Sequence, residues 1–475
     1  MSKTLANSVV VLLLFSAWLP VSWADPRLAD ADPVLTMGAG MRYRYEFQDD
    51  FNQKFYGRNP PAGTTDDGFL LGRFRAGIDW YPVADIHVAL WGQHAVCWDS
   101  SMKDEDFYNA SFRREDNPNK DYLELYTTYI EFNHLFAQSL SLRVGRQLVS
   151  YGDCRIFGPG EWGNTGRWIW DAAKLSWRFD RGFVDLFYGR TMLHDVNTFS
   201  LNHRHGFEGL GGYGHVDLVQ RPFLIAFEPT FFTKDDRHDN YTGETMMYVA
   251  DGAGGATFLR RTGDIDSWYV GGRLYGRDIH GFDFDFTFLR EAGDFAGDDL
   301  DAYGWHAMVG YHLPLPWKPF ATLQYSYASG DDDPADGDHE TFSGAFGARD
   351  RMYGRMNLFH WRNLKDYEAG LELKPHKKVR MEAGFHKFLL AEKADAWYLN
   401  PKAYRDPTGG SGDEVGRELD IITTWEPSPN NVLMAGYGHF WPDEFARKMA
   451  SDTEADWVFL QWEYTFGKTL VAREN

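Results

Sequence analysis

Alternation of apolar and polar residues is the feature of this sequence that most constrains its fold. In residues 281–290, GFDFDFTFLR, every second residue is phenylalanine and the intervening residues are Asp283, Asp285 and Thr287. Successive side chains of a β-strand point to opposite faces, so such a stretch has one apolar and one polar face. About eighteen such stretches follow one another, each near the roughly 9–11 residues that a tilted membrane-spanning strand needs. They lie near 41–48, 69–81, 85–97, 122–133, 139–150, 170–179, 182–191, 208–218, 222–232, 265–275, 281–290, 300–312, 318–328, 365–375, 378–389, 415–426, 431–441 and 456–466.

The links between these stretches alternate between short and long. Short links follow every second stretch, as at 82–84, 180–181, 375–377 and 427–430. Long polar links follow the others, at 49–67, 98–121, 151–169, 191–207, 233–264, 329–364, 390–414 and 442–455, while the link after 281–290 is shorter but acidic. An outer-membrane barrel has this asymmetry, and a soluble β-sandwich gives no reason for it. The sequence therefore predicts an all-β fold: a transmembrane antiparallel β-barrel of about 18 strands, with short periplasmic turns and long extracellular loops.

The N-terminal residues have the composition of a secretory signal. Lys3 precedes an apolar run from Val9 to Leu19, and Ser22-Trp23-Ala24 forms a small-x-small end. This pattern predicts a signal peptide over 1–24 that is cleaved after Ala24, with the barrel formed by 25–475. We therefore expect an exported protein of the bacterial outer membrane.

The strand at 68–81, GFLLGRFRAGIDWY, shows what a barrel interior would carry. Phe74, Ile78 and Trp80 share one face and would contact lipid, while Arg73 and Arg75 share the other and would face a lumen. The same alternation predicts these lumen-facing arginines: Arg42, Arg44, Arg73, Arg75, Arg143, Arg273 and Arg380. A bulge at Gly145 would turn Arg146 inward as well. The predicted acidic counter-charges are Glu46, Asp79, Glu368, Glu372, Glu382, Glu418, Asp420 and Glu463.

Three stretches make the chain resemble the alginate export porins of bacterial outer membranes. They are SLRVGRQLVSYGDCRIFG (141–158) with NTGRWIWDAAKLSW (164–177), RDRMYGRMNLFHWRNL (349–364) and GRELDIITTW (416–425). The resemblance implies a monomeric, eighteen-stranded barrel whose narrow, arginine-rich lumen passes a polyanionic uronate polymer to the outside. It places Arg146, Arg349, Arg351 and Arg355 in segments associated with the conduction path, and it implies a periplasmic polymer-export complex as partner. The last three of these arginines lie in the long loop 329–364, which could fold into the lumen as a constriction.

Other functions remain open at this point. A barrel of this type could instead be an uptake channel for small anions or acidic oligosaccharides, and a soluble secreted β-protein that binds or cleaves sugars is a third interpretation. An enzyme is not expected, because the sequence has neither a GxSxG motif nor a Ser–His pair that periodicity would bring together. Anion-selective diffusion needs no cofactor, and the net charge of −21 argues against a nucleic-acid partner. The expected partners are an anionic polysaccharide, lipid and lipopolysaccharide.

Two groups of residues raise the question of metals and of a disulfide. The acidic stretch 330–340, GDDDPADGDHE, contains Asp331, Asp333, Asp336 and Asp338, which could bind calcium, but its spacing matches no known calcium loop. We expect a solvated loop there, and we predict no metal site. His194 and the HRH stretch at 203–205 lie in a loop and could suggest a metal, without a spacing that specifies one. Cys97 and Cys154 could form one disulfide or remain free thiols.

Overall fold

The computed structural model describes residues 34–52, 55–57, 63–109, 114–136, 139–160, 162–199, 201, 204–236, 246–250, 256–259, 264–333, 336–348, 352–399 and 402–471. The predicted signal peptide at 1–24 lies outside these residues. None of the described helices is long and apolar enough to cross a membrane.

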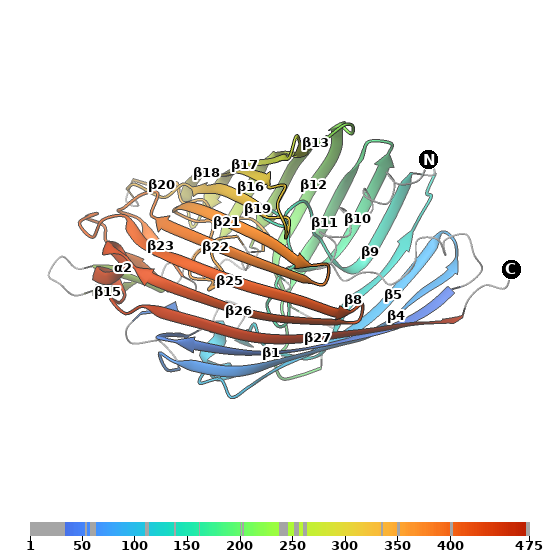
Figure 1. The fold of residues 1–475 in the computed structure, drawn as a ribbon, viewed down its shortest axis with the longest axis horizontal. Helices are drawn as coiled ribbons and strands as arrows, with labels where there is room; N and C mark the ends of the chain where they lie inside the picture. The colour runs from blue at the N-terminus through green and yellow to red at the C-terminus, as the bar shows by residue number, and fades with distance from the viewer. Residues whose placement is uncertain are drawn as a thin grey trace.

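One antiparallel sheet closes on itself to form the barrel (Figure 1). The sheet has 19 strands, of which β20 (Asp338–His339) is a two-residue addition beside β18, so the barrel itself has eighteen strands. These are β1 (Val34–Asp49), β4 (Asp67–Val83), β5 (Ile86–Trp98), β8 (Asp121–Phe132), β9 (Leu140–Leu148), β10 (Ile169–Phe179), β11 (Gly182–Met192), β12 (His205–Val219), β13 (Leu224–Asp235), β16 (Ile265–Ile279), β17 (Phe282–Phe295), β18 (Asp298–His312), β19 (Phe320–Ala328), β21 (Leu364–His376), β22 (Val379–Leu389), β25 (Glu414–Ser428), β26 (Asn431–Pro442) and β27 (Ala455–Val471). The predicted fold class and strand number are confirmed.

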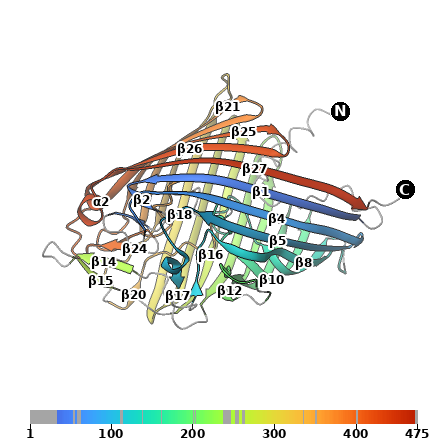
Figure 2. The ribbon, with the colours of Figure 1, turned by 90° about the horizontal axis from the view of Figure 1, so that it is seen from below.

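The first and last strands close the barrel. The pairing of β1 with β27 runs from Leu35 opposite Val471 to Asp49 opposite Asp456. Figure 2 shows β27, β1, β4 and β5 side by side in one wall, with β16, β17 and β18 in the opposite part of the barrel. Because the chain closes edge to edge, every one of these eighteen strands has a paired strand on each side.

The links follow the predicted alternation with one exception. Links of a few residues join β4 to β5 and β10 to β11, whereas long loops follow β1, β5, β9, β13 and β19. At the long-loop end, β17 and β18 extend further and are joined only by Ala296 and Gly297, both with positive φ. This tight turn explains why the link after 281–290 looked short in the sequence.

The two faces of the wall differ as the alternation predicts. On β4, Phe74 and Trp80 are 48% and 44% exposed on the outside, whereas Arg73 is 8% exposed on the inside. Apolar residues thus cover the outer surface and charged residues line the interior, which is the reverse of a soluble β-sandwich.

Small elements decorate the long-loop end. The loops after β13 and β22 meet in a four-stranded sheet of β14 (Met246–Ala250), β15 (Ala256–Leu259), β23 (Ala396–Tyr398) and β24 (Lys402–Arg405). The others are β2 (Phe51–Asn52), β3 (Phe55–Tyr56), a 3₁₀ turn (Asp104–Phe107), β6 (Tyr108–Asn109), β7 (Arg114–Glu115) and α2 (Glu444–Met449). Figure 1 shows α2, β15 and β23 grouped at the end opposite the C-terminus of β27.

A large aromatic cluster joins the loops after β9 and β19 to the inner wall. Phe157 and Phe346, one from each loop, form an isolated β-bridge and pack with ring centroids 5.9 Å apart. Trp170 of β10 and Phe232 of β13 pack against this pair. The core of the molecule therefore lies inside the barrel, between loops and wall.

Candidate conduction path

Most of the predicted lumen charges lie on the inner face of the barrel. The structure places Arg42, Arg44, Arg73, Arg75, Arg143, Arg273 and Arg380 there, together with Glu46, Asp79, Glu368, Glu372, Glu382, Glu418, Asp420 and Glu463. Their part in conduction remains a prediction.

Four of these arginines form one group on adjacent strands, which we call the arginine group (Arg42, Arg44, Arg73 and Arg75). Arg42 of β1 lies directly opposite Arg73 of β4, and Arg75 lies two positions further along β4. On its other side, Arg42 lies opposite Glu463 of β27. Like charges directly opposite each other destabilise a sheet, so other groups must compensate this arrangement.

The loop between β9 and β10 supplies part of that compensation. Arg42 Nη2 donates to Gly163 O at 3.0 Å and to Asn164 Oδ1 at 3.1 Å, and Arg44 Nη1 donates to Trp162 O at 2.7 Å. The Asn164 amide in turn donates to the carbonyl oxygens of Gly72, Val96 and Asn119. Two arginines of the group thus hold the loop against β1, β4 and β5.

The same loop also contacts the opposite side of the barrel. Tyr151 stacks on Tyr213 of β12 with centroids 4.2 Å apart, and its hydroxyl donates to Asp185 Oδ2 of β11 at 2.8 Å. Gly152 comes so close to Glu228 of β13 that an added Cβ would lie 2.9 Å from Oε2. Since β12 and β13 lie about half the circumference away from β1, the loop crosses the lumen. Sequence reasoning missed this; the only hint was the aromatic- and glycine-rich, weakly charged stretch 151–170.

The buried side chain of Arg155 joins this crossing loop to the loop after β19. Arg155 Nε lies 3.2 Å from Asp153 Oδ2, and Arg155 Nη1 donates to the Tyr353 hydroxyl at 3.2 Å. Burial alone would raise the pKa of Asp153, but Arg155 and Arg273 outweigh it and hold that pKa well below its usual range. The pair therefore stays ionised, and Arg155 links the two loops through Tyr353.

Arg75 and Asp79 have separate partners. Arg75 Nε donates to Gln93 Oε1 at 2.6 Å and its guanidinium lies over the Tyr126 ring, 3.8 Å from the centroid. Asp79 instead bonds His87 at 2.8 Å and Trp91 Nε1 at 3.0 Å. Asp79, which we expected to balance the charges of Arg73 and Arg75, is thus hydrogen-bonded to two residues of β5.

The other inner-face arginines lie beside carboxylates. Arg143 contacts Glu131 at 2.9 Å, and Arg380 lies 3.9 Å from Glu372 and 3.7 Å from Glu382. Arg273 donates to both carboxylate oxygens of Asp285, from Nε at 2.8 Å and from Nη2 at 2.5 Å. Its Nη1 donates to Glu228 Oε2 at 3.1 Å. Such pairs neutralise one another locally, and Arg44 of the arginine group is paired in the same way, with Nε 2.6 Å from Glu46 Oε1.

Arg146 does not join the inner-face arginines. Gly145 has φ +128°, but the pairing of β9 with β10 continues through it without a register shift, so the expected bulge is not there. Arg146 forms two 2.8 Å bonds to Asp171. Asp171 alternates with Trp170 and Ala172, which belong to the interior cluster, so it lies on the outer face. The prediction that a bulge turns Arg146 inward was wrong.

The loop after β19 contacts the inner wall at several points. Ser343 N donates to Glu291 Oε2 of β17 at 2.7 Å, while the backbone N–H groups of Arg355 and Met356 donate to Asp420 and Glu418 of β25 at 3.1 and 2.9 Å. The Arg355 guanidinium lies 3.9 Å from Glu382. Arg349 and Arg351 lie outside the described residues. That 329–364 forms a constriction remains a prediction.

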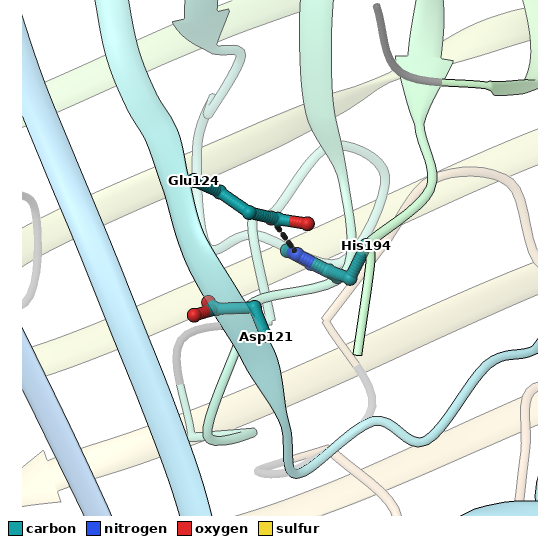
Figure 3. A group of neighbouring side chains, drawn as sticks. All are labelled: Asp121, Glu124 and His194. Atoms are coloured by element: carbon teal, nitrogen blue, oxygen red, sulfur yellow. Dashed lines mark hydrogen bonds and ion pairs between the residues drawn. The ribbon is translucent and has the colours of Figure 1, made fainter. Parts of the chain in front are cut away.

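Two groups of side chains could in principle hold a metal ion, as judged over the described residues. They are Asp121, Glu124 and His194, and Asp366, Glu368 and His386, and in each the ligand atoms lie within 4.8 Å of one another. Figure 3 shows the first group, with His194 from the loop after β11 pointing at Glu124 of β8. Spacing could not find either group, because each depends on strand pairing or on a loop contact.

The first of these groups is internally satisfied. His194 lies 2.7 Å from Glu124 Oε2 through Nδ1 and 2.6 Å from Gly166 O through Nε2. Both acceptors are oxygens that cannot donate to it, so the imidazole donates twice and is cationic. Burial alone would lower the pKa of His194, but the charge and hydrogen bond of Glu124 raise it to about 9. The positively charged side chain of His194 therefore links β8 to the crossing loop.

The four aspartates of the acidic stretch 330–340 were the candidates for binding calcium. No metal-binding group includes Asp331, Asp333, Asp336 or Asp338 in the part of the chain that the structure describes. Asp331 is buried beside Asp395, whereas the other three are exposed. Burial, followed by the Asp395 charge, raises the pKa of Asp331 to about 7.

Cys97 and Cys154 are both free thiols. Of the two alternatives that the sequence left open, one disulfide or two free thiols, the structure has the second.

Comparisons with known proteins agree with this architecture. The family model for alginate export matches residues 34–459. The sequence matches none of the curated proteins. Similar solved structures include the outer membrane protein OprD from Pseudomonas aeruginosa (10% identity, 92% of this chain and 94% of that one, TM-score 0.53) and OccAB1 from Acinetobacter baumannii (8%, 92% and 97%, 0.55). A third is OpdK from Pseudomonas aeruginosa with vanillate (7%, 91% and 99%, 0.55).

At these identities the solved structures show the shared barrel fold, while the family match covers nearly all of the described barrel. The chain therefore belongs to the alginate export family, and it is a bacterial outer-membrane β-barrel of the porin type.

Proposed function

We propose that this barrel passes an anionic polysaccharide, alginate or a similar polyuronate, outward across the outer membrane. The observation that carries the proposal is the arginine group, in which Arg42 lies directly opposite Arg73 on the inner wall. A polyuronate carries one carboxylate per sugar, and guanidinium groups pair carboxylates bidentately without losing their charge. Neighbouring arginines would offer successive exchange sites to such a chain.

The acidic residues of the inner wall fit the need for release. Conduction requires binding that is weak enough for the solute to leave each site. Arg143, Arg273 and Arg380 each have a carboxylate close by, so an incoming polymer would compete with it. Transport by diffusion needs neither a nucleophile nor a cofactor, and we propose no catalytic role. A periplasmic polymer-export complex and lipopolysaccharide remain proposed partners, and the monomeric state is proposed as well.

The alternative is uptake of small anions or acidic oligosaccharides. It is favoured by the crossing loop, which shares the lumen with the arginine group, and by the structurally similar OpdK, whose structure contains vanillate, a small carboxylate. Direction separates the two functions. Export predicts block by polyuronate added to the side of the short turns, whereas uptake predicts permeation of small carboxylates from the side of the long loops.

Planar-bilayer recordings test the proposal. Purified protein should be anion-selective, and polyuronate should block its current. Exchanging Arg73 and Arg75 for glutamate should weaken both properties, because two cations of the group become anions. Arg290→Glu is the matched control, since Arg290 faces outward and pairs with Asp301 at 2.8 Å. A wild-type channel that is cation-selective and unaffected by polyuronate would overturn the proposal.

A further inference from the structure

A row of aromatic and basic side chains crosses five neighbouring strands near the long-loop end of the barrel. In the strand register, Tyr325 of β19 lies opposite Tyr367 of β21, and Tyr367 lies opposite Lys387 of β22. The row continues from Lys387 to Arg417 of β25 and from Arg417 to Trp441 of β26. Figure 1 shows β21, β22, β25 and β26 side by side in one part of the wall. Two cations thus lie directly opposite each other, with aromatic residues on both sides.

The exposure of nearby apolar residues shows that this row is on the outer face. Tyr367 is 51% exposed, and Phe385 and Ile421, which share the parity of Lys387 and Arg417, are 42% and 40% exposed. Lys387 lies close to the end of β22 at Leu389, and Arg417 lies close to the start of β25, where the long loop between these strands joins the wall. Aromatic residues of outer-membrane barrels mark the two membrane interfaces. The row therefore lies at the level of the lipid headgroups of the outer leaflet.

A third cation lies beside the pair. Lys365 of β21 is the diagonal neighbour of Lys387, because it comes two positions before Tyr367 on the same face. Cβ atoms of directly opposite residues are about 5 Å apart and those of diagonal neighbours about 7–8 Å, distances that lysine and arginine side chains span. We call Lys365, Lys387 and Arg417 the basic patch. The Lys365 ammonium donates to the Ala391 carbonyl at 3.0 Å, which is a neutral acceptor.

The carboxylates beside the basic patch leave many of its donors unused. Lys387 Nζ lies 2.6 Å from Glu414 Oε1, while Arg417 donates to Asp443 from Nε at 3.2 Å and from Nη2 at 3.0 Å. An ammonium has three N–H donors and a guanidinium has five, so these contacts use a minority of them. The side chains of Lys387 and Glu414 are 41% and 45% exposed, and exposed ion pairs are weak. An anion with several oxygens can therefore compete for both cations.

The outer rim has the opposite charge on β16, β17 and β18. Asp266 lies opposite Asp294, and Asp294 lies opposite Asp299. Asp266 shares the parity of Trp268, and Asp299 that of Tyr303, both of which are exposed on the outer face. This row of carboxylates repels an anionic headgroup, whereas the basic patch attracts one. Anion binding is therefore expected at β21, β22 and β25 and not at β16 to β18.

We propose that the basic patch binds a phosphate group of the phosphorylated glycolipid of the outer leaflet, lipopolysaccharide. Phosphate oxygens accept two parallel hydrogen bonds from a guanidinium and pair with ammonium groups as point charges. A phosphate between Lys387 and Arg417 would also relieve the repulsion of two directly opposed cations. Tyr367 and Trp441 would flank the headgroup. This inference gives the lipopolysaccharide partnership proposed above a specific site, and it does not depend on which solute the barrel passes.

Binding of lipid A to the purified full-length protein tests the site. Bisphosphorylated lipid A is titrated into the protein in detergent micelles that contain EDTA, and bound lipid is counted by native mass spectrometry. The wild type should bind this lipid and should bind dephosphorylated lipid A more weakly. The double variant Lys387→Gln/Arg417→Gln should lose about tenfold or more in affinity, because two charge-assisted contacts disappear.

Two further variants separate phosphate binding from a structural role. Glu414→Gln should tighten binding severalfold, because it removes the carboxylate that competes for Lys387. A patch that only stabilises the wall predicts no such gain. Arg290→Gln is the matched control, since Arg290 is also an exposed outer-face cation paired with a carboxylate, but it lies on β17 in the acidic sector. It should bind lipid A as the wild type does.

Four results would overturn the proposal. Equal binding of phosphorylated and dephosphorylated lipid A would mean that acyl chains alone are recognised, and wild-type binding by the double variant would place the phosphate elsewhere. Competition by inorganic phosphate at the concentration of the lipid would indicate a site for free anions. Binding that requires Mg²⁺ in place of EDTA and is lost in Asp294→Asn would assign the lipid to cations bridged by the acidic row. If the double variant fails to fold, as judged by heat-modifiable mobility on gels, Glu414→Gln decides, and an affinity no higher than that of the wild type would overturn the proposal.

Discussion

The guanidinium of Arg44 lies over the indole ring of Trp162, with Cζ 4.1 Å from the ring centroid, while Nη1 donates to the Trp162 carbonyl at 2.7 Å. The two residues are 118 positions apart in the chain. Trp162 also packs edge-on against Phe459 of β27, with centroids 4.9 Å apart. One inner-wall arginine thus fixes a lumen-crossing loop to the seam where the barrel closes.

Replacing Arg44 with alanine should loosen the crossing loop. The lost charged hydrogen bond and cation–π contact are together worth on the order of 2 kcal/mol, or about a thirtyfold change in the ratio of docked to released loop. Single-channel recordings should therefore show larger or more frequent open states. Arg290→Ala, which removes an exposed arginine on the outer face, should leave the recordings unchanged. Unchanged gating in Arg44→Ala would mean that Asn164 and the aromatic packing hold the loop without it.

Period-two alternation explains which parts of this protein could be read from its sequence. In a closed barrel every strand has one lipid face and one lumen face, so parity alone placed Arg73 and Arg75 correctly. Parity alone would also have kept Arg146 on the outer face; the error there was the assumed bulge, since Arg146 pairs with Asp171 in an unbroken register. The crossing loop and the cluster around His386 depend on contacts between distant segments, as from Arg42 to Gly163, which no local pattern encodes.

Replacing Arg146 with alanine should leave ion selectivity unchanged, because its two bonds to Asp171 hold it on the outer face. The cost should appear in stability instead, at about 1.5–3 kcal/mol, since Asp171, whose side chain is 31% exposed, would keep only its bond to His205. Reversal potentials in a salt gradient, together with urea unfolding in micelles, separate the two effects. A selectivity loss comparable with that of Arg73→Glu would place Arg146 in the conduction path after all.

The link that His194 makes between β8 and the crossing loop should weaken at alkaline pH. Its pKa is raised to about 9, so the folded state holds the proton more tightly than the unfolded state does. The stabilisation is therefore complete below about pH 6.5 and is lost as the pH rises through 9, by on the order of 3 kcal/mol in total. Unfolding free energies measured from pH 6 to 10 should show this decline. His194→Gln should flatten it, and an equally steep decline in that variant would assign the effect to other groups.

Asp331 should oppose folding once it ionises. Its pKa is raised to about 7 by burial and by the nearby Asp395, while His339 lies 3.8 Å away and Arg405 partly offsets the effect. The folded state therefore binds more protons than the unfolded state between about pH 4 and 7, so stability falls as the pH rises through that window. Asparagine at this position cannot ionise and keeps the backbone N–H that bonds Asp395.

Asp331→Asn should thus be more stable than the wild type at pH 8, with the difference vanishing near pH 4. Urea unfolding at the two pH values measures this directly. Asp338→Asn is the matched control, because Asp338 lies in the same loop with its side chain exposed, and its removal should change neither value. A variant at Asp331 that is less stable than the wild type at pH 8 would show that the carboxylate is ionised and favourably bound, as a cation held by the acidic loop would make it.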